Sequence, residues 1–242
     1  MPDSTVPVLI GCSHGTDSVA GRAAIGSILD GVRRAHPDLD VREAFVDVQQ
    51  PEVADVVAGA LTDVGTAVVV PLLLSAGYHV HVDIAEAVAR AGATASGALG
   101  PDTRLVDILV DRLVAAGAGP GDAVVLAAAG STDPRAADAV EEVARHVRRA
   151  WPHGPVVIGY GAGAQPSVPD AVAAARADGA ARVVIASYLL APGFFHDRLL
   201  AAGADVVTDP LAPDERLVPV VVDRYTTGAE RLAQQRLVPA GV

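Results

Sequence analysis

The chain has 242 residues, of which 51% are hydrophobic, 19% charged and only 3% aromatic. This composition excludes intrinsic disorder, and the length corresponds to one large or two small domains. The net charge is −11, and because an acidic chain with few aromatic residues lacks the basic surface and stacking side chains of a nucleic-acid-binding protein, we expect no nucleic-acid partner.

Apolar runs typical of buried strands alternate along the whole chain with segments typical of helices. The predicted strands are 6–12, 41–48, 66–74, 95–99, 122–129, 156–161, 182–190 and 205–209. The predicted helices are 18–35, 51–63, 80–91, 102–116, 134–150, 167–178, 194–202 and 213–232. This alternation indicates an α/β fold of parallel sheets with helices on both faces.

The second half of the chain repeats the first. Four segments recur in the same order, at offsets between 112 and 116 residues: 8–17 with 124–133, 50–55 with 165–170, 73–78 with 189–194, and 101–106 with 213–218. We therefore predict two homologous α/β domains, residues 1–116 and 122–242. Residues 115–121, which are rich in Gly and Pro, are the expected linker.

No segment is expected to cross or enter a membrane. The longest strongly apolar run, 67–76, is too short to span a bilayer. The first residues also lack the basic start and apolar stretch of a signal peptide. The single cysteine, Cys12, excludes an intramolecular disulfide, and we expect it to be a small buried side chain. These features predict a cytoplasmic protein.

Three histidines are expected at one rim of the first sheet. Ligands of parallel sheets bind outside the carboxyl ends of the strands, and the segments 13–16 and 75–81 follow the first and third strands. In the alignment of the two halves, His14, His79 and His81 correspond to Gly130, Phe195 and Asp197. Loop histidines often serve only as surface or hydrogen-bonding residues, but their absence from the second copy favours a functional pair, His14 and His79.

Other residues near this rim allow two interpretations each. His81 enters a predicted helix and faces either the site or solvent, and His196 either reaches the cleft or lies on the surface. Asp47, at the end of the second strand, either orients an imidazole or accepts a proton, or it caps the helix that begins near Pro51.

Several common enzyme motifs are absent from the sequence. A P-loop is excluded because the chain contains no lysine. Neither a dinucleotide-binding glycine motif nor a nucleophile elbow follows the first strand. Nucleotide-dependent, hydride-transfer and α/β-hydrolase chemistry therefore lose their usual support.

The chain resembles the class II tetrapyrrole chelatases, and in particular the sirohydrochlorin chelatases. The resemblance is carried by His14-Gly15 after the first strand, by 45–48 at the end of the second, and by 71–80. It covers nearly the whole chain, because long members of that family are also tandem α/β repeats. It implies insertion of Fe²⁺ or Co²⁺ into sirohydrochlorin, without ATP, in the cleft between the domains, as a step of siroheme or cobalamin biosynthesis.

The resemblance also implies roles for individual residues. His14 and His79 would bind the metal, and Asp47 stands where most members have Glu, while His81 stands where they have Lys or Arg. The residues expected to contact the tetrapyrrole are Gly15, Ser75, Gly77 and Tyr78. No cofactor is expected beyond the divalent metal substrate, and a monomer is expected because both halves lie in one chain.

The chemistry of the residues agrees with this reading. A chelatase must hold its metal loosely, and two neutral imidazoles suit iron and cobalt while leaving most coordination positions open. Histidine can also accept a proton near pH 7. Because sirohydrochlorin carries eight carboxylates, Arg side chains and helix N-termini should line the cleft. Two alternatives remain from the residues alone: a two-lobed small-molecule or metal-binding module without turnover, and a hydrolase with a His-bound metal.

Overall fold

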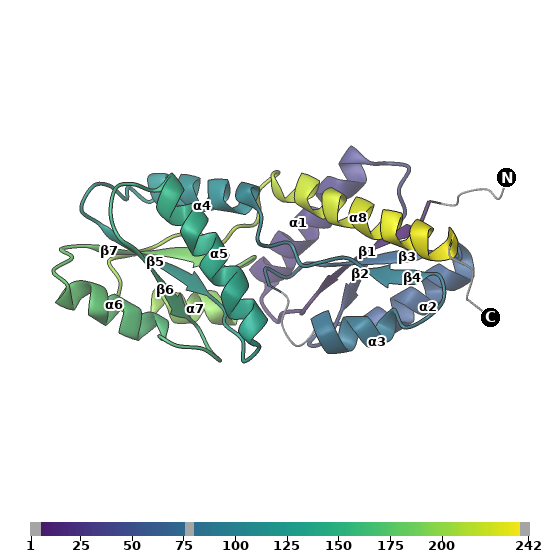
Figure 1. Ribbon diagram of the computed structural model, residues 1–242, viewed down its shortest axis with the longest axis horizontal. Coiled ribbons are helices and arrows are strands. Elements are labelled where there is room, and N and C mark those ends of the chain that lie inside the picture. Colours follow the sequence, from purple (N-terminus) through teal and green to yellow (C-terminus); the bar gives the residue numbers. More distant parts are fainter. Residues whose placement is uncertain (1–5, 76–79, 238–242) are drawn as a thin grey trace.

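The computed structural model describes residues 6–75 and 80–237. Within these residues the strands form two four-stranded parallel sheets, one in each lobe (Figure 1). The first sheet has the order β2-β1-β3-β4 and contains β1 (Val8–Ser13), β2 (Val41–Phe45), β3 (Ala67–Pro71) and β4 (Ala93–Ala95). The second has the same order, β6-β5-β7-β8, with β5 (Ala123–Ala128), β6 (Val156–Tyr160), β7 (Val183–Tyr188) and β8 (Val206–Val207). This identity confirms the prediction of two copies of one α/β fold.

Helices connect the strands and cover both faces of each sheet. They are α1 (Val19–Ala35), α2 (Val53–Asp63), α3 (Ala85–Ala87), α4 (Thr103–Ala115), α5 (Pro134–Ala150), α6 (Val168–Ala177), α7 (Phe194–Leu200) and α8 (Leu217–Leu237). A π-helical turn, η1 (Val80–Ile84), leads directly into α3. The helix predicted over 80–91 is therefore two short pieces. No helix in the described ranges is both long and apolar enough to cross a membrane.

The fourth strand differs from its prediction of 95–99. It begins at Ala93, immediately after Gly92, and its last hydrogen bond to β3 runs from the amide of Ser96 to the carbonyl O of Val69 at 2.9 Å. The apolar residues that follow, Ala98 and Leu99, are buried outside the ladder, and Leu99 belongs to the core shared by the lobes. The hydrophobicity of this run therefore reflects packing between the lobes.

Alternating residues of β1 face two different cores, as the two-residue period of a strand requires. Leu9 joins a core shared with α1, whereas Ile10 and Cys12 join one shared with α2. Cys12 is fully buried, as expected, and burial, with a smaller contribution from Asp83, raises the pKa of its thiol to about 12. The thiol is therefore an apolar core side chain at neutral pH.

The helices that end the two halves cross over to the opposite lobe. Helix α4 follows β4 of the first sheet but packs against α5 and β7 of the second. Helix α8 ends the chain and packs against β3, β4 and α1 of the first lobe, where it is the yellow helix in Figure 1. The predicted boundary at 116–122 separates the two sheets, but each sheet is covered in part by a helix of the other half.

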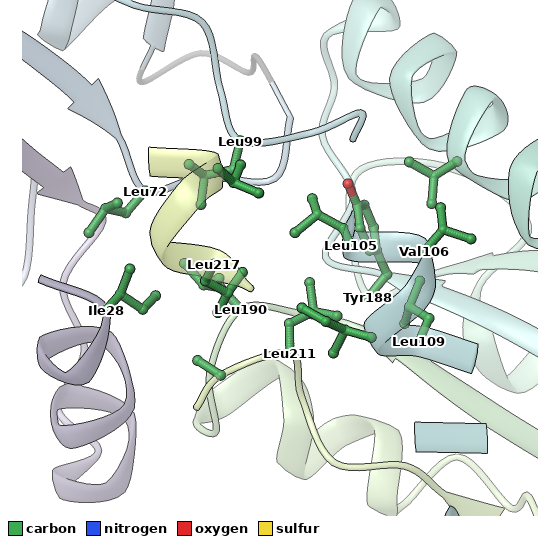
Figure 2. Packing of buried hydrophobic residues seen from close by; sticks show 14 of the residues in the cluster. Ile28, Leu72, Leu99, Leu105, Val106, Leu109, Tyr188, Leu190, Leu211 and Leu217 are labelled. Carbon is green, nitrogen blue, oxygen red and sulfur yellow. The ribbon is translucent and has the colours of Figure 1, made fainter. Parts of the chain in front are cut away.

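This exchange joins one face of each sheet into a continuous apolar core. Figure 2 shows its centre, in which Ile28 and Leu72 of the first lobe belong to one cluster with Leu190 and Leu211 of the second. The opposite faces of the sheets have separate cores. The lobes are therefore packed together through one face of each sheet.

Reciprocal ion pairs connect the two lobes. Arg104 lies 2.7 Å from the carboxylate of Asp223, and its counterpart Arg216 lies 2.6 Å from that of Asp111. Both aspartates are the same distance along the sequence from the arginines of their own half. This arrangement, in which each half donates and receives the same contact, is that of a twofold interface.

Two further arginines bind backbone carbonyls of the half of the chain to which they do not belong. Arg224 donates from Nε to the carbonyl O of Ala98 and from Nη2 to that of Leu99, both at 2.8 Å. Its counterpart Arg112 donates to the carbonyl O of Pro213 at 3.0 Å. These contacts fix the loops that precede α4 and α8.

The ladders correct the alignment of the repeats by one residue. Leu9 of β1 and Val124 of β5 both face the core shared by the lobes, and their amides donate to the carbonyl O of Asp40 and Pro155, respectively. These equivalent positions give an offset of 115 residues over the paired strands. The sequence match over 8–17 uses an offset of 116 because it aligns two Thr-Asp pairs. The backbone hydrogen bonds therefore set the offset between the repeats at 115 residues over these strands.

The corrected register gives His14 a different counterpart. His14 corresponds to Ala129 rather than to Gly130, and Gly130 corresponds to Gly15 instead. Both glycines have positive φ, 91° for Gly15 and 87° for Gly130, at the same point of the strand-to-helix turn. The second copy still lacks the imidazole, so the asymmetry between the halves holds.

Candidate functional site

A cavity of about 1340 Å³ lies between the two lobes. Its wall contains the segments that follow β1, β3, β5 and β7 at their carboxyl ends, where parallel sheets bind ligands. The volume exceeds the roughly 300–1,000 Å³ typical of small-molecule sites. The cavity therefore suits a ligand larger than most metabolites.

The turn between β1 and α1 forms one part of the wall and contains His14. A β-carbon on Gly15 would lie 2.7 Å from the carbonyl O of Asp47, so only glycine allows this turn to pass so close to the end of β2. The amide of Thr16 donates to Oε1 of Gln49 at 2.9 Å, and Ser18 caps α1. His14 is half-buried in this wall, as the sequence predicts.

Asp47 lies beside His14 through its backbone. Its amide donates to the carbonyl O of His14 at 3.2 Å, but its exposed carboxylate accepts the amide of Val48 at 2.8 Å. Val48 and Gln49 line the cavity, whereas Asp47 does not. The expectation that Asp47 caps α2 is wrong, because Glu52 occupies the N-cap of that helix. Its catalytic role stays a prediction.

The segment after β3 is held from both lobes up to Ser75, which lines the cavity. The amide of Leu72 donates to the carbonyl O of Cys12 at 2.7 Å, and the hydroxyl of Tyr188 donates to the carbonyl O of Leu74 at 3.3 Å. Burial raises the pKa of Tyr188 above its ordinary range, so the hydroxyl remains a donor at neutral pH.

The predicted site residues that follow Ser75 are not among those that the structure describes. Gly77, Tyr78 and His79 lie outside the described residues, as does the side chain of His81. In the described parts of the chain, no group of three or more His, Cys, Asp or Glu side chains is placed to hold a metal ion.

His196 does not reach the cavity. Its Nε2 lies 3.2 Å from the carbonyl O of Thr208, and the residue is not part of the wall. The neighbouring residues Phe195 and Asp197 line the cavity instead. Of the two interpretations of His196, the one that brings it into the cleft is therefore wrong.

Two ionisable residues of the wall, Glu43 and Arg22, are not apparent from the sequence alone. Glu43 lies on β2, and burial raises the pKa of its carboxyl, with Arg33 opposing the shift. Arg22 is exposed on α1 and lines the cavity near its opening turn. The signal that could have found them is the same as for His14, namely an ionisable residue without a counterpart in the second half.

The two walls of the cavity differ in chemistry. At the corrected offset, His14, Arg22, Glu43 and Asp47 of the first lobe correspond to Ala129, Ala137, Ile158 and Ala162 of the second. The second wall consists mainly of Ala, Gly, Leu and Phe residues. Apart from tyrosines, Asp197 is the only ionisable side chain among the described residues of this wall. The cavity therefore has one reactive wall and one largely apolar wall.

Comparison with solved structures identifies proteins of the same architecture. SirB from Bacillus subtilis, solved with Fe³⁺, superposes with a TM-score of 0.80 at 19% identity, covering 95% of this chain and 98% of that one. SirB from Bacillus subtilis subspecies spizizenii, solved as a sirohydrochlorin chelatase in complex with cobalt, gives 0.74 at 19% identity, covering 95% and 97%. CbiX, the terminal enzyme of siroheme biosynthesis in denitrifying bacteria, gives 0.64 at 17% identity, covering 91% and 98%.

Comparison by sequence identifies the family. A search of the curated proteins found no match. The model of the CbiX family, however, matches the chain twice, over residues 8–116 and 123–228. The two matches cover most of the chain and coincide with its two repeats. The chain therefore belongs to the CbiX family.

Proposed function

We propose that the protein is a sirohydrochlorin chelatase, which inserts Fe²⁺ or Co²⁺ into the macrocycle without ATP. The observation that carries the proposal is the large cavity between two homologous lobes, of which only the first contributes His14, Arg22 and Glu43 to the wall. Membership of the CbiX family supports it, as do the names of the structural neighbours, which are chelatases solved with iron or cobalt.

The macrocycle would lie in the cavity with one face toward the apolar wall of the second lobe. Phe194 and Phe195, whose rings are 5.5 Å apart, provide aromatic surface there. Aromatic rings pack favourably against a flat conjugated ligand. The opposite face of the macrocycle would then be presented to His14.

His14 and His79 would deliver the metal in this arrangement. Neutral imidazoles bind Fe²⁺ and Co²⁺ and leave coordination positions free for the pyrrole nitrogens. As the metal passes to the macrocycle, two pyrrole N–H groups lose their protons. The imidazoles released from the metal can accept these protons near pH 7. Asp47, beside His14, would adjust the position of the imidazole.

The sequence, through its resemblance to the sirohydrochlorin chelatases, supports further roles for individual residues and for the protein. Gly15, Ser75, Gly77 and Tyr78 would contact the tetrapyrrole, of which Gly15 and Ser75 line the cavity. The protein would act as a cytoplasmic monomer. It would serve siroheme or cobalamin biosynthesis, depending on which metal it inserts.

Anaerobic metallation of sirohydrochlorin tests the proposal. The protein is incubated with the macrocycle and either Fe²⁺ or Co²⁺, with and without ATP, and the absorbance spectrum is followed against a protein-free control. The expected result is a rate above the spontaneous one that ATP does not change. Tight binding of the macrocycle at an unchanged rate of metallation would show a binding module instead, and would overturn the proposal.

A further inference from the structure

Comparison of the two repeats distinguishes arginines that serve the shared fold from arginines that are present in only one copy. Arg33 on α1 and its counterpart Arg148 on α5 both donate to carbonyls of the neighbouring strand, those of Val41 at 3.1 Å and Val156 at 2.9 Å. An arginine that is kept at the same place in both copies, with the same bond, serves the fold that the copies share.

Arg22 does not follow this pattern. Its counterpart at the same offset is Ala137, and both residues line the cavity. The fold therefore does not require a guanidinium at this point. The same comparison that distinguishes His14 from Ala129 distinguishes Arg22 from Ala137.

The position of Arg22 on α1 directs it to the ligand. Ile25 and Gly26, three and four residues further on, also line the cavity, so this face of the helix is turned toward it. Nη2 of Arg22 donates to the carbonyl O of Asp17 at 3.0 Å, which holds the guanidinium near the turn that contains His14. No carboxylate of the described residues forms an ion pair with it.

The charge of the wall gives Arg22 a specific task. Among the described residues that line the cavity, Arg22 is the only arginine, and the chain has no lysine. The same wall carries Asp17, Glu43 and Asp197, which repel an anionic ligand. A guanidinium with free N–H groups can bind a carboxylate in a bidentate manner.

We propose that Arg22 binds a carboxylate at the edge of the ligand and so sets which edge of the macrocycle enters beside His14. This inference rests on the proposed function, because it takes a polycarboxylate macrocycle as the ligand. Arg22 is thereby a substrate-binding residue that takes no part in transferring the metal.

Binding and metallation by matched variants test this inference. Arg22→Ala is compared with Arg34→Ala, which removes an exposed arginine from the far end of the same helix, outside the cavity wall. Arg22→Lys tests whether a point charge suffices. Each protein is titrated with metal-free sirohydrochlorin and with uroporphyrin, an octacarboxylate, and with mesoporphyrin, a dicarboxylate, while the Co²⁺ insertion rate gives kcat and KM.

Arg22→Ala should raise the Kd for the two octacarboxylates about tenfold, because one charge-assisted contact of about 1.4 kcal/mol is lost. KM should rise by the same factor, kcat should stay near that of the wild type, and the dicarboxylate should be less affected. Arg34→Ala should bind like the wild type, and Arg22→Lys should fall between. Because exposed arginines seldom affect stability, melting temperatures should agree within the series.

The outcomes separate this inference from the proposed function. If Arg22→Ala binds the octacarboxylates as the wild type does, and both metallate sirohydrochlorin, the role of Arg22 is wrong and the chelatase stands. A fall in kcat with unchanged Kd would also refute the role in binding. If the wild type neither binds nor metallates sirohydrochlorin, both proposals fail.

Discussion

Replacing Arg224 with alanine should destabilise the protein more than the same replacement of its counterpart Arg112. Arg224 donates two hydrogen bonds of 2.8 Å to carbonyls of the other half of the chain, and both acceptor residues, Ala98 and Leu99, are buried. Arg112 makes one comparable bond, of 3.0 Å, to Pro213. The two sites occupy equivalent places in the repeats, so each serves as the control for the other.

The magnitudes follow from the number of carbonyls left without a donor. A hydrogen bond to a charged group contributes about 1.5–3 kcal/mol, and the side chain of Arg224 is 24% exposed, which favours the lower end. We therefore expect a loss of about 3–4 kcal/mol in the free energy of unfolding for Arg224→Ala and about 1–2 kcal/mol for Arg112→Ala. For a chain of this size the first corresponds to a fall of about 10 °C in Tm, and the second to about 4 °C.

Thermal and urea unfolding followed by circular dichroism measure both variants. Arg224→Lys should recover only part of the loss, because an ammonium group does not match the fork of two donors. Equal destabilisation at the two sites, or a loss below about 1 kcal/mol for Arg224→Ala, would refute the account of the junction.

Three further predictions concern single groups near the cavity. Tyr188→Phe removes the hydroxyl that binds the carbonyl O of Leu74 and should cost about 1 kcal/mol in urea unfolding; unchanged stability would contradict that contact. Burial raises the pKa of the Glu43 carboxyl above its value in the unfolded chain. The stability of the protein therefore falls as the pH rises from the unfolded pKa through the folded pKa, and below the unfolded pKa there is no loss. Glu43→Gln should therefore raise the free energy of unfolding at pH 8 by about a few tenths of a kcal/mol after solvent screening, and leave it unchanged at pH 3; a rise at pH 3 alone would contradict the sign. Asp47→Asn should slow metallation at an unchanged Tm, since an amide oxygen can still accept the amide of Val48, whereas Asp38→Asn, an exposed control, should do neither; a lower Tm with a normal rate would make Asp47 structural.

The sequence predicts the order of the elements because the signals for strands and turns are local. All six residues of β1 are buried, so an uninterrupted apolar run marks the strand. The crossing of α4 and α8 could not be predicted in this way. The apolar stripe of α4 shows that one face is buried, but not which of two similar sheets it covers.

The site is predicted in part for a similar reason. His14 follows a buried strand directly, so topology alone brings it to the wall of the cavity. Arg22 lies within a helix and looks like any exposed arginine until the repeats are aligned in the correct register. That register depends on strand pairing, and pairing is a tertiary property that the matching Thr-Asp pairs concealed.

The central claim is that His14 and His79 act together on the metal, and a double-mutant cycle tests it most directly. His14→Ala, His79→Ala and the double variant are assayed for anaerobic Co²⁺ insertion into sirohydrochlorin, with His81→Ala alongside and Tm as the control for folding. If each imidazole supplies half of one site, either single change should remove most of the rate above background, and the double change should cost little more. Retention of the wild-type rate by either single variant, at an unchanged Tm, would contradict the claim.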